Sequence, residues 1–329
     1  MKNFLVKNRK WFAGLSICVV FSVVLTFFYR NQFFYNLLVL ICIWSMNGMG
    51  WNVIGGYCGQ VSNGHCLFYG IGAYVVALGT YKFGLSPWIT IWLGMIISVV
   101  IAFIIGKPIL RLHGHVFAIS TMALAESVRI IFNNWPWAGG ATGVYMLNKK
   151  LSPLIALQLT NIVDYFYLYL VFVVIVLILM KYLDKTKFFY YLRAIKENEL
   201  AAESSGVNAA KYKNRAYMLS AAIVSLAGSM YAQFILYIDP STMLTLNISM
   251  MIVLVAVMGG VGTVEGPILG AIILETISEY SRKYLGKFGG VDMVLYGTLV
   301  ILIVLFIPGG ILSIFNKNKK RIFLASRKR

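Results

Sequence analysis

Apolar runs of about 20 residues, separated by short polar or glycine-rich stretches, repeat along the whole chain. A helix rises about 1.5 Å per residue, so a run of this length crosses the ~30 Å hydrocarbon layer of a membrane. Barrel strands alternate in polarity over about 10 residues, so the pattern favours an all-α, polytopic transmembrane helical bundle over a barrel. Ten spans are predicted, at 11–29, 33–54, 61–80, 88–106, 115–135, 164–183, 215–236, 244–262, 267–285 and 291–312.

The first interruption of this pattern, GGYCGQVSNGHCLFYGIG at 55–72, combines six glycines with several polar side chains. Glycine lets helices approach closely or lets the backbone break within a membrane. Polar groups at that depth must be buried in protein or line water. Two interpretations stay open, a tight turn with close helix packing or a broken element beside a translocation path. The candidate residues are Gly59, Gln60, Ser62 and His65.

Ionisable residues also lie inside apolar runs. Glu126 and Arg129 are three residues apart, so they can meet on one helical face. Charge at membrane depth is costly and therefore usually finds a partner within the bundle. The pair is either a structural ion pair or part of the border of a translocation path. Glu275 and Glu279 are one turn apart in another span, near its predicted outer end.

A second glycine cluster, GGVGTVEGPILGA, covers residues 259–271. It loosely resembles the first cluster, but the two do not fall at equivalent places in two halves, so no internal repeat is inferred. Gly259, Gly260 and Glu265 are the candidate residues here, near the predicted cytoplasmic side. They are either structural or part of the translocation path.

Composition agrees with the pattern and sets the orientation. Charged residues make up 12% of the chain, about half of the ~25% typical of soluble domains. With the N-terminus in the cytoplasm and the spans alternating, 21 of the 29 lysines and arginines fall on the cytoplasmic side. We therefore expect a multi-pass protein of a prokaryotic cell (inner) membrane, with both termini in the cytoplasm. The net charge of +18 suits anionic membrane lipid, and its scatter over loops and ends argues against a nucleic-acid role.

Motifs for an enzyme are absent from the sequence. No phosphate-binding G-x-x-x-x-G-K-[ST], zinc-binding H-E-x-x-H or nucleophile-bearing G-x-S-x-G occurs. The cysteines lie in or beside apolar runs and, with the three histidines, form no zinc-ligand spacing. We expect no catalytic residue, metal or cofactor, and any use of ATP requires another chain.

The segment RAIKENELAAESSGVNAAKYKNRAYML, at 193–219, carries eight charged residues within an otherwise apolar chain. Residues 188–213 are too polar to span a membrane and suit a cytoplasmic helix that ends at Gly206. Arg193 could pair with Glu197, and Lys196 with Glu199. The helix either anchors a loop at the interface or docks a soluble partner.

Five segments resemble the branched-chain amino acid ABC transporter permeases of the LivM type. They occur in family order across residues 47–285: the cluster at 55–74, RLHGHVFAISTMALAESVRIIFNNW at 111–135, GGATGV at 139–144, the charged segment with the span after it, and MGGVGTVEGPILGA. The resemblance implies one permease domain over 1–329. It would carry a cytoplasmic coupling loop at about 185–214 and a basic tail at 313–329.

The resemblance also implies partners and roles. A LivH-type permease would complete the pore, two ATP-binding-cassette subunits would dock below it, and an extracytoplasmic binding protein would deliver leucine, isoleucine or valine. Urea or short amides are the alternative cargo, and an ion-coupled secondary transporter is the alternative class. The implied role of the coupling loop is to transmit ATPase closure to the spans. Its matching residues are Arg193, Glu197, Glu199, Ala201, Ala202 and Gly206.

Overall fold

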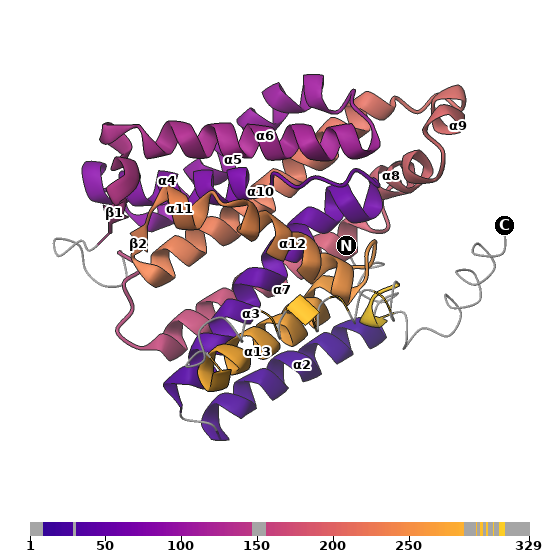
Figure 1. Ribbon diagram of the computed structural model, residues 1–329. Coiled ribbons are helices and arrows are strands. Elements are labelled where there is room, and N and C mark those ends of the chain that lie inside the picture. Colours follow the sequence, from indigo (N-terminus) through magenta and orange to yellow (C-terminus); the bar gives the residue numbers. More distant parts are fainter. Residues whose placement is uncertain are drawn as a thin grey trace.

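The computed structural model describes residues 9–28, 31–146 and 156–285, together with 294, 297, 298, 301, 305 and 309–312. Within these residues the chain is a bundle of long helices joined by short connections (Figure 1). The long helices are α2 (Arg9–Phe28), α3 (Gln32–Trp51), α4 (Cys66–Phe83), α5 (Pro87–Ile109), α6 (Gly114–Asn133), α7 (Ile162–Leu183), α10 (Ala209–Ile235), α12 (Leu246–Gly259) and α13 (Gly266–Leu285).

Short elements mark the places where the long helices are interrupted. A six-residue π-helix extends α3, two 3-10 turns follow α6, and two short helices precede α10. One antiparallel pair of two-residue strands, in which Val144 lies opposite Ile238, closes one end of the bundle. These elements are η1 (Asn52–Tyr57), η2 (Pro136–Ala138), η3 (Gly140–Thr142), β1 (Val144–Tyr145), α8 (Lys187–Glu197), α9 (Glu199–Ser204), β2 (Tyr237–Ile238) and α11 (Pro240–Met243).

The predicted all-α transmembrane architecture is confirmed. Seven helical stretches of the described chain are long and apolar enough to cross a membrane, and they coincide with the second to eighth predicted spans. The first and ninth predicted spans fall on α2 and α13, which have 20 residues each. The tenth, at 291–312, lies mostly outside the described residues, so the total of ten stays a prediction.

Helix α10 lies at the centre of the bundle, with α3, α4 and α5 against it (Figure 1). Small residues make this possible. A side-chain carbon at Gly228 of α10 would collide with the carbonyl of Tyr69, and one at Gly72 of α4 would collide with that of Ser225. Since apolar burial drives little helix association within lipid, such close backbone packing is what holds the central helices together.

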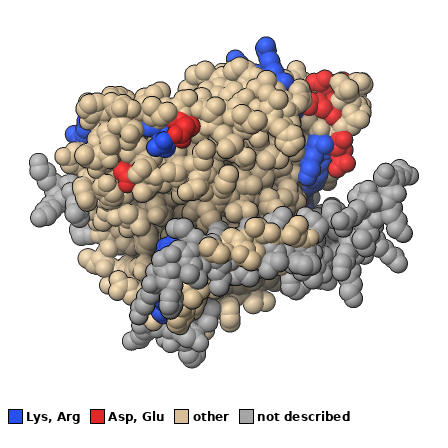
Figure 2. Space-filling model, in the orientation of Figure 1, with Lys and Arg blue, Asp and Glu red and all other residues tan. Residues whose placement is uncertain are grey.

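The outer helices are less covered. In α6 only Phe117, Thr121 and Ala125 are buried. Helices α2 and α13 lie on the side of the bundle opposite α6 (Figure 1). Most of the described surface is uncharged, and charged side chains gather where α8 and α9 lie (Figure 2). We call this end, where α3, α5, α7 and α12 finish and α6 and α10 begin, the platform end.

Candidate functional site: a platform of short helices and a polar face at membrane depth

Helix α8 packs on the platform end through one apolar face. Phe189, Leu192 and Ile195 recur every three residues and are buried. The ring of Phe189 meets the ring of Tyr57 edge to face, with 4.5 Å between centroids. This periodicity seats α8 directly against η1, and so joins a segment outside the membrane to the end of a membrane helix.

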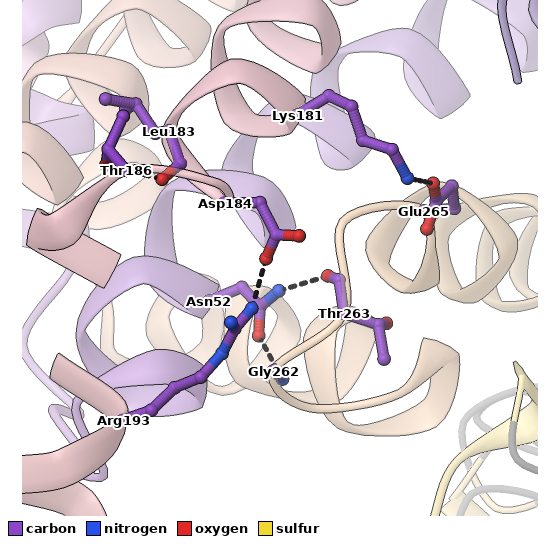
Figure 3. Close-up of polar contacts among 9 residues, drawn as sticks. All are labelled: Asn52, Lys181, Leu183, Asp184, Thr186, Arg193, Gly262, Thr263 and Glu265. Carbon is purple, nitrogen blue, oxygen red and sulfur yellow. Dashed lines mark hydrogen bonds and ion pairs between the residues drawn. The ribbon is translucent and has the colours of Figure 1, made fainter. Parts of the chain in front are cut away.

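The loop between α12 and α13 is clamped to η1 by one buried amide (Figure 3). Asn52 donates to the carbonyl oxygen of Thr263 at 2.6 Å and accepts from the backbone N–H of Gly262 at 2.8 Å. The side chain of Asn52 is fully buried. At Gly56 a side-chain carbon would meet Asn52 and the Gly262 nitrogen, so only glycine allows this approach. The two glycine clusters of the sequence therefore meet here.

Charged contacts surround this clamp and tie it to α7 and α8 (Figure 3). Lys181, in the last turn of α7, donates to Glu265 at 2.5 Å. The Arg193 guanidinium on α8 pairs with Asp184, just beyond α7. Lys196 donates to the Gly56 carbonyl at 2.8 Å. Four separate segments are thus joined within one layer.

Glu265 has a second donor, the indole N–H of Trp11 on α2, at 2.5 Å. Burial of this carboxylate tends to raise its pKa, but hydrogen bonds and charge from Lys181, together with Trp11, hold the pKa below its usual range. Glu265 is therefore ionised at neutral pH and links the start of α2 to the end of α7.

Helix α9 has only six residues and is held in place by side chains of neighbouring segments. Asn198 caps its start by accepting from the Ala201 N–H at 3.0 Å. Glu199 receives two hydrogen bonds of 2.5 Å from Lys213, whose side chain is 1% exposed, and lies 3.4 Å from His113. These contacts fix α9 to the first turns of α10 and to the connection between α5 and α6.

The prediction of one continuous helix from residue 188 to Gly206 is wrong. The chain is extended at Asn198, with φ −158° and ψ 108°, so α8 and α9 are separate helices. Arg193 binds Asp184, which replaces the predicted Glu197 partner. The predicted stop is confirmed, because Gly206 follows α9 with φ +86°, in the left-handed region.

The six predicted coupling residues divide between two faces of the platform. Ala202 is buried, while Glu197, Ala201 and Gly206 are exposed. Leu200, which is not among the predicted coupling residues, is 76% exposed. Its apolar side chain, together with the exposed Ala201, gives α9 an uncovered surface outside the membrane helices.

A groove of about 1040 Å³ runs beside α9. Residues of α5, of the connection to α6, of α9 and of α10 line it. Four of its cations make no ion pair with any described residue: Lys107, Arg111, Lys211 and Arg215. The groove gives the exposed side of α9 a predominantly basic border.

Residues 58–65 return from η1 into the bundle without forming a helix. His65 is fully buried there, 3.0 Å from the Ser62 hydroxyl and 2.7 Å from that of Ser220. Ser220 lies eleven residues into α10, which places it roughly 16 Å from the platform end. The predicted third span therefore begins later than residue 61, because α4 starts only at Cys66.

This non-helical segment is open on one side. Gly59 and Val61 are exposed and Gln60 is half-buried. Asn63 contacts α6, because its backbone N–H donates to the Thr121 hydroxyl at 3.1 Å. Irregular backbone at this depth occurs only where protein covers it or water reaches it. The connection is an eight-residue non-helical segment, and its glycines at 64 and 72 also pack closely on neighbouring helices, so a place beside a translocation path stays a prediction.

Glu126 and Arg129 form the predicted ion pair in the middle of α6. The Nε of Arg129 lies 3.1 and 2.9 Å from the two carboxylate oxygens, and Nη2 also reaches Oε1. The side chains are 37% and 29% exposed. An ion pair this open would be costly to expose to lipid.

Gly259 and Gly260, predicted as either structural or part of the translocation path, lie where α12 ends. Gly259 ends α12 and is buried, and a side-chain carbon there would collide with the Gly266 carbonyl. Gly260 follows with φ +135° and leads into the clamped loop. Sequence reasoning missed Asn52, Asp184 and Lys213, which hold the platform together. A polar residue at the end of each apolar run was the available signal.

Comparison with known proteins places the chain in a family. Residues 33–305 match the branched-chain amino acid transport system permease components. The chain belongs to this family. The high-affinity branched-chain amino acid transport system permease protein LivM of Salmonella typhimurium is 29% identical over 301 residues, which cover 84% of this chain and 69% of that protein. LivM of Escherichia coli matches with the same identity and coverage.

A second kind of relative is more distant. The permease protein LivH of Salmonella typhimurium is 23% identical over 313 residues, 87% of this chain and 96% of its own. No solved structure matches the chain. Family membership and the apolar helices together make this chain a multi-pass membrane protein of a transport system.

Proposed function

We propose that this chain is a membrane-spanning permease subunit of an ABC importer that carries leucine, isoleucine and valine. The observation that supports this most is the platform of α8 and α9, which belongs to a chain of the branched-chain permease family. Urea or short amides are not favoured, because the related proteins are named for branched-chain amino acids. An ion-coupled transporter would have no need for such a docking surface.

The platform end is cytoplasmic in this proposal, with both chain termini on the same side. That orientation follows the positive-inside rule, which the basic segment at 181–215 and the basic tail at 313–329 satisfy. The tail lies outside the described residues. The opposite end, which carries the paired strands, then faces the binding protein.

Mechanical coupling follows from the contacts of the platform. A soluble ATPase that binds the exposed Leu200 and Ala201 would move α9, and through it α8. Movement of α8 reaches α3 through the Tyr57–Phe189 contact, and reaches the loop before α13 through the clamp around Asn52. ATP binding can open the pore only if these contacts make the arrangement of the membrane helices in the ATP-bound state differ in free energy from that in the ATP-free state.

The partners implied are a LivH-type permease, two ATP-binding-cassette subunits and an extracytoplasmic substrate-binding protein. The chain itself would bind no ATP, no metal and no cofactor. The exposed residues Gly59 and Val61 and the partly exposed Glu126–Arg129 pair would line the translocation path or the contact with the second permease. Both roles keep these polar groups away from lipid.

The test is purification of the tagged chain in mild detergent from its native membrane, with identification of the bound proteins. Two ATP-binding-cassette subunits and a second permease, followed by ATP-dependent leucine uptake in proteoliposomes, would support the proposal. If the chain emerges without ATPases from membranes that contain them, or if the complex imports urea but not leucine, the proposal is wrong.

A further inference from the structure

We propose that the Glu126–Arg129 pair is a transient binding site for zwitterionic amino acids, in which Arg129 binds the substrate carboxylate and Glu126 the ammonium group. The inference rests on the proposed transport function and adds a substrate class and a site to it. The argument uses the position of the pair, its unused hydrogen-bonding capacity and the side chains around it.

The pair lies at membrane depth. Glu126 is twelve residues beyond the start of α6 at the platform end, so it lies roughly 18 Å along the helix axis. The segment 58–65 starts at the platform end, where Gly59 lies against Lys196, and further along it contacts α6, with the Asn63 N–H bonded to Thr121 and the Asn63 amide 3.8 Å from the Met122 sulfur. The ion pair therefore lies on the same helix that Asn63 contacts, about one turn beyond that contact.

The pair keeps capacity for a ligand. Arg129 uses Nε and Nη2 on Glu126, whereas Nη1 donates to no residue that the structure describes. Each carboxylate oxygen of Glu126 has two lone pairs, so an ammonium group can bind without displacing Arg129. A zwitterionic amino acid can thus bind to the pair while each of its own charges, and those of Glu126 and Arg129, keeps a partner of opposite charge.

The result is a cluster of four charges that alternate in sign. In water a free amino acid is well solvated, but in a narrow path its two charges lose that hydration at a large cost. Charge-assisted hydrogen bonds from Arg129 and to Glu126 offset this loss. A neutral amide or urea has no full charges and would gain much less.

Exposed apolar side chains on the segments that contact α6 suit a branched substrate. Val61 is 47% exposed on the segment that precedes Asn63, and Met250 is 51% exposed on α12, which contacts α6. Met122 is half-buried one turn before Glu126. A leucine held by its charged end at the pair has thioether and aliphatic surface available for its side chain.

The experiment uses the whole importer, with partner permease, ATPases and binding protein, in proteoliposomes. The decisive variant is Glu126→Gln combined with Arg129→Gln, which removes both charges and leaves no unpaired ion. A merely structural pair, partly exposed, contributes little, so the neutral variant would then transport normally. We expect leucine uptake to fall about tenfold or more, with binding-protein-stimulated ATP hydrolysis kept within about twofold.

A second variant guards against failure of assembly. Arg129→Lys retains the charge pair with Glu126 but loses the planar Nη1 donor, and we expect it to assemble and to lose about tenfold in leucine uptake. Ser127→Ala is the control, because the exposed Ser127 hydroxyl bonds only the Ala123 carbonyl of its own helix. It should transport like the wild type.

The outcomes separate this site from the proposed function. Normal leucine uptake by the wild type together with normal uptake by the doubly neutral variant, or by Arg129→Lys, would overturn the binding site alone. No ATP-dependent amino acid uptake by the wild type would overturn the transport function and, with it, this site. Loss of uptake with retained ATP hydrolysis supports both.

Discussion

Replacing Lys213 by methionine tests whether α9 is held in place by one buried ion pair. Lys213 is 1% exposed and donates twice to Glu199, at 2.5 Å. A six-residue helix is not stable alone, so the position of α9 depends on such ties. Lys213→Met keeps the aliphatic volume of the side chain and removes only the ammonium.

The magnitude follows from the exposure of the two partners. Breaking a fully buried pair costs about 3–5 kcal/mol, but Glu199 is 27% exposed and can turn toward water and His113. We therefore expect about 2 kcal/mol, which shifts the docked population of α9 about thirtyfold. Residues outside α9 should keep their stability.

Hydrogen exchange of the assembled importer measures this. The backbone amides at 202–207, such as that of Val207 bonded to the Ala202 carbonyl at 3.0 Å, should exchange about thirtyfold faster in Lys213→Met. Leucine uptake per ATP hydrolysed should fall in parallel. Lys211→Met is the matched control, because Lys211 is exposed and makes no ion pair with a described residue. Equal protection in the two variants would refute the reasoning.

Three further predictions concern the rest of the platform. Asn52→Leu leaves two buried backbone groups unpaired and should cost about 2–4 kcal/mol of stability, measured as a lower melting temperature of the detergent-solubilised protein. Asn47→Leu is the control, because Asn47 is equally buried but bonds the Ile43 carbonyl of its own helix, and it should cost under about 1 kcal/mol. Equal losses in the two variants would contradict the clamp. Gly206→Ala, at φ +86° with open space around it, should cost about 1 kcal/mol and loosen the amides of α9, and an unchanged exchange pattern would count against the left-handed stop. Because the pKa of Glu265 is lowered in the folded protein, its contribution to stability is complete above the ordinary pKa near 4.5 and is lost as pH falls through the lower folded pKa. The melting temperature should drop in that pH range, and Glu265→Gln should remove this part of the drop.

Apolar run length determined most of the fold from the sequence. A helix in lipid must satisfy its backbone internally, so each run of about 20 apolar residues has one available structure. Each predicted span between 11 and 285 falls on a helix, although the helix of the third begins later than predicted. The interruptions were also visible, since glycine and polar residues mark each of them. The charge pattern likewise identified the platform segment.

The partners of the charged residues could not be read from the sequence. Local spacing paired Arg193 with Glu197, but the packing of α8 on η1 brings Asp184 closer, and the extended backbone at Asn198 turns α9 toward Lys213. A choice among several possible ion pairs depends on distances between segments remote in the chain.

Depth in the membrane was likewise decided by the tertiary structure. Sequence position could not tell whether residues 55–65 form a turn or a broken element, because both use the same glycines and polar groups. Packing of α4 against α10, which the glycines at 72 and 228 permit, holds Cys66 well inside the bundle and leaves 58–65 without a helix. The sequence alone therefore determines which segments enter the membrane, since that depends on local hydrophobicity. Only the tertiary structure determines which polar groups meet there, since that depends on close contact between helices.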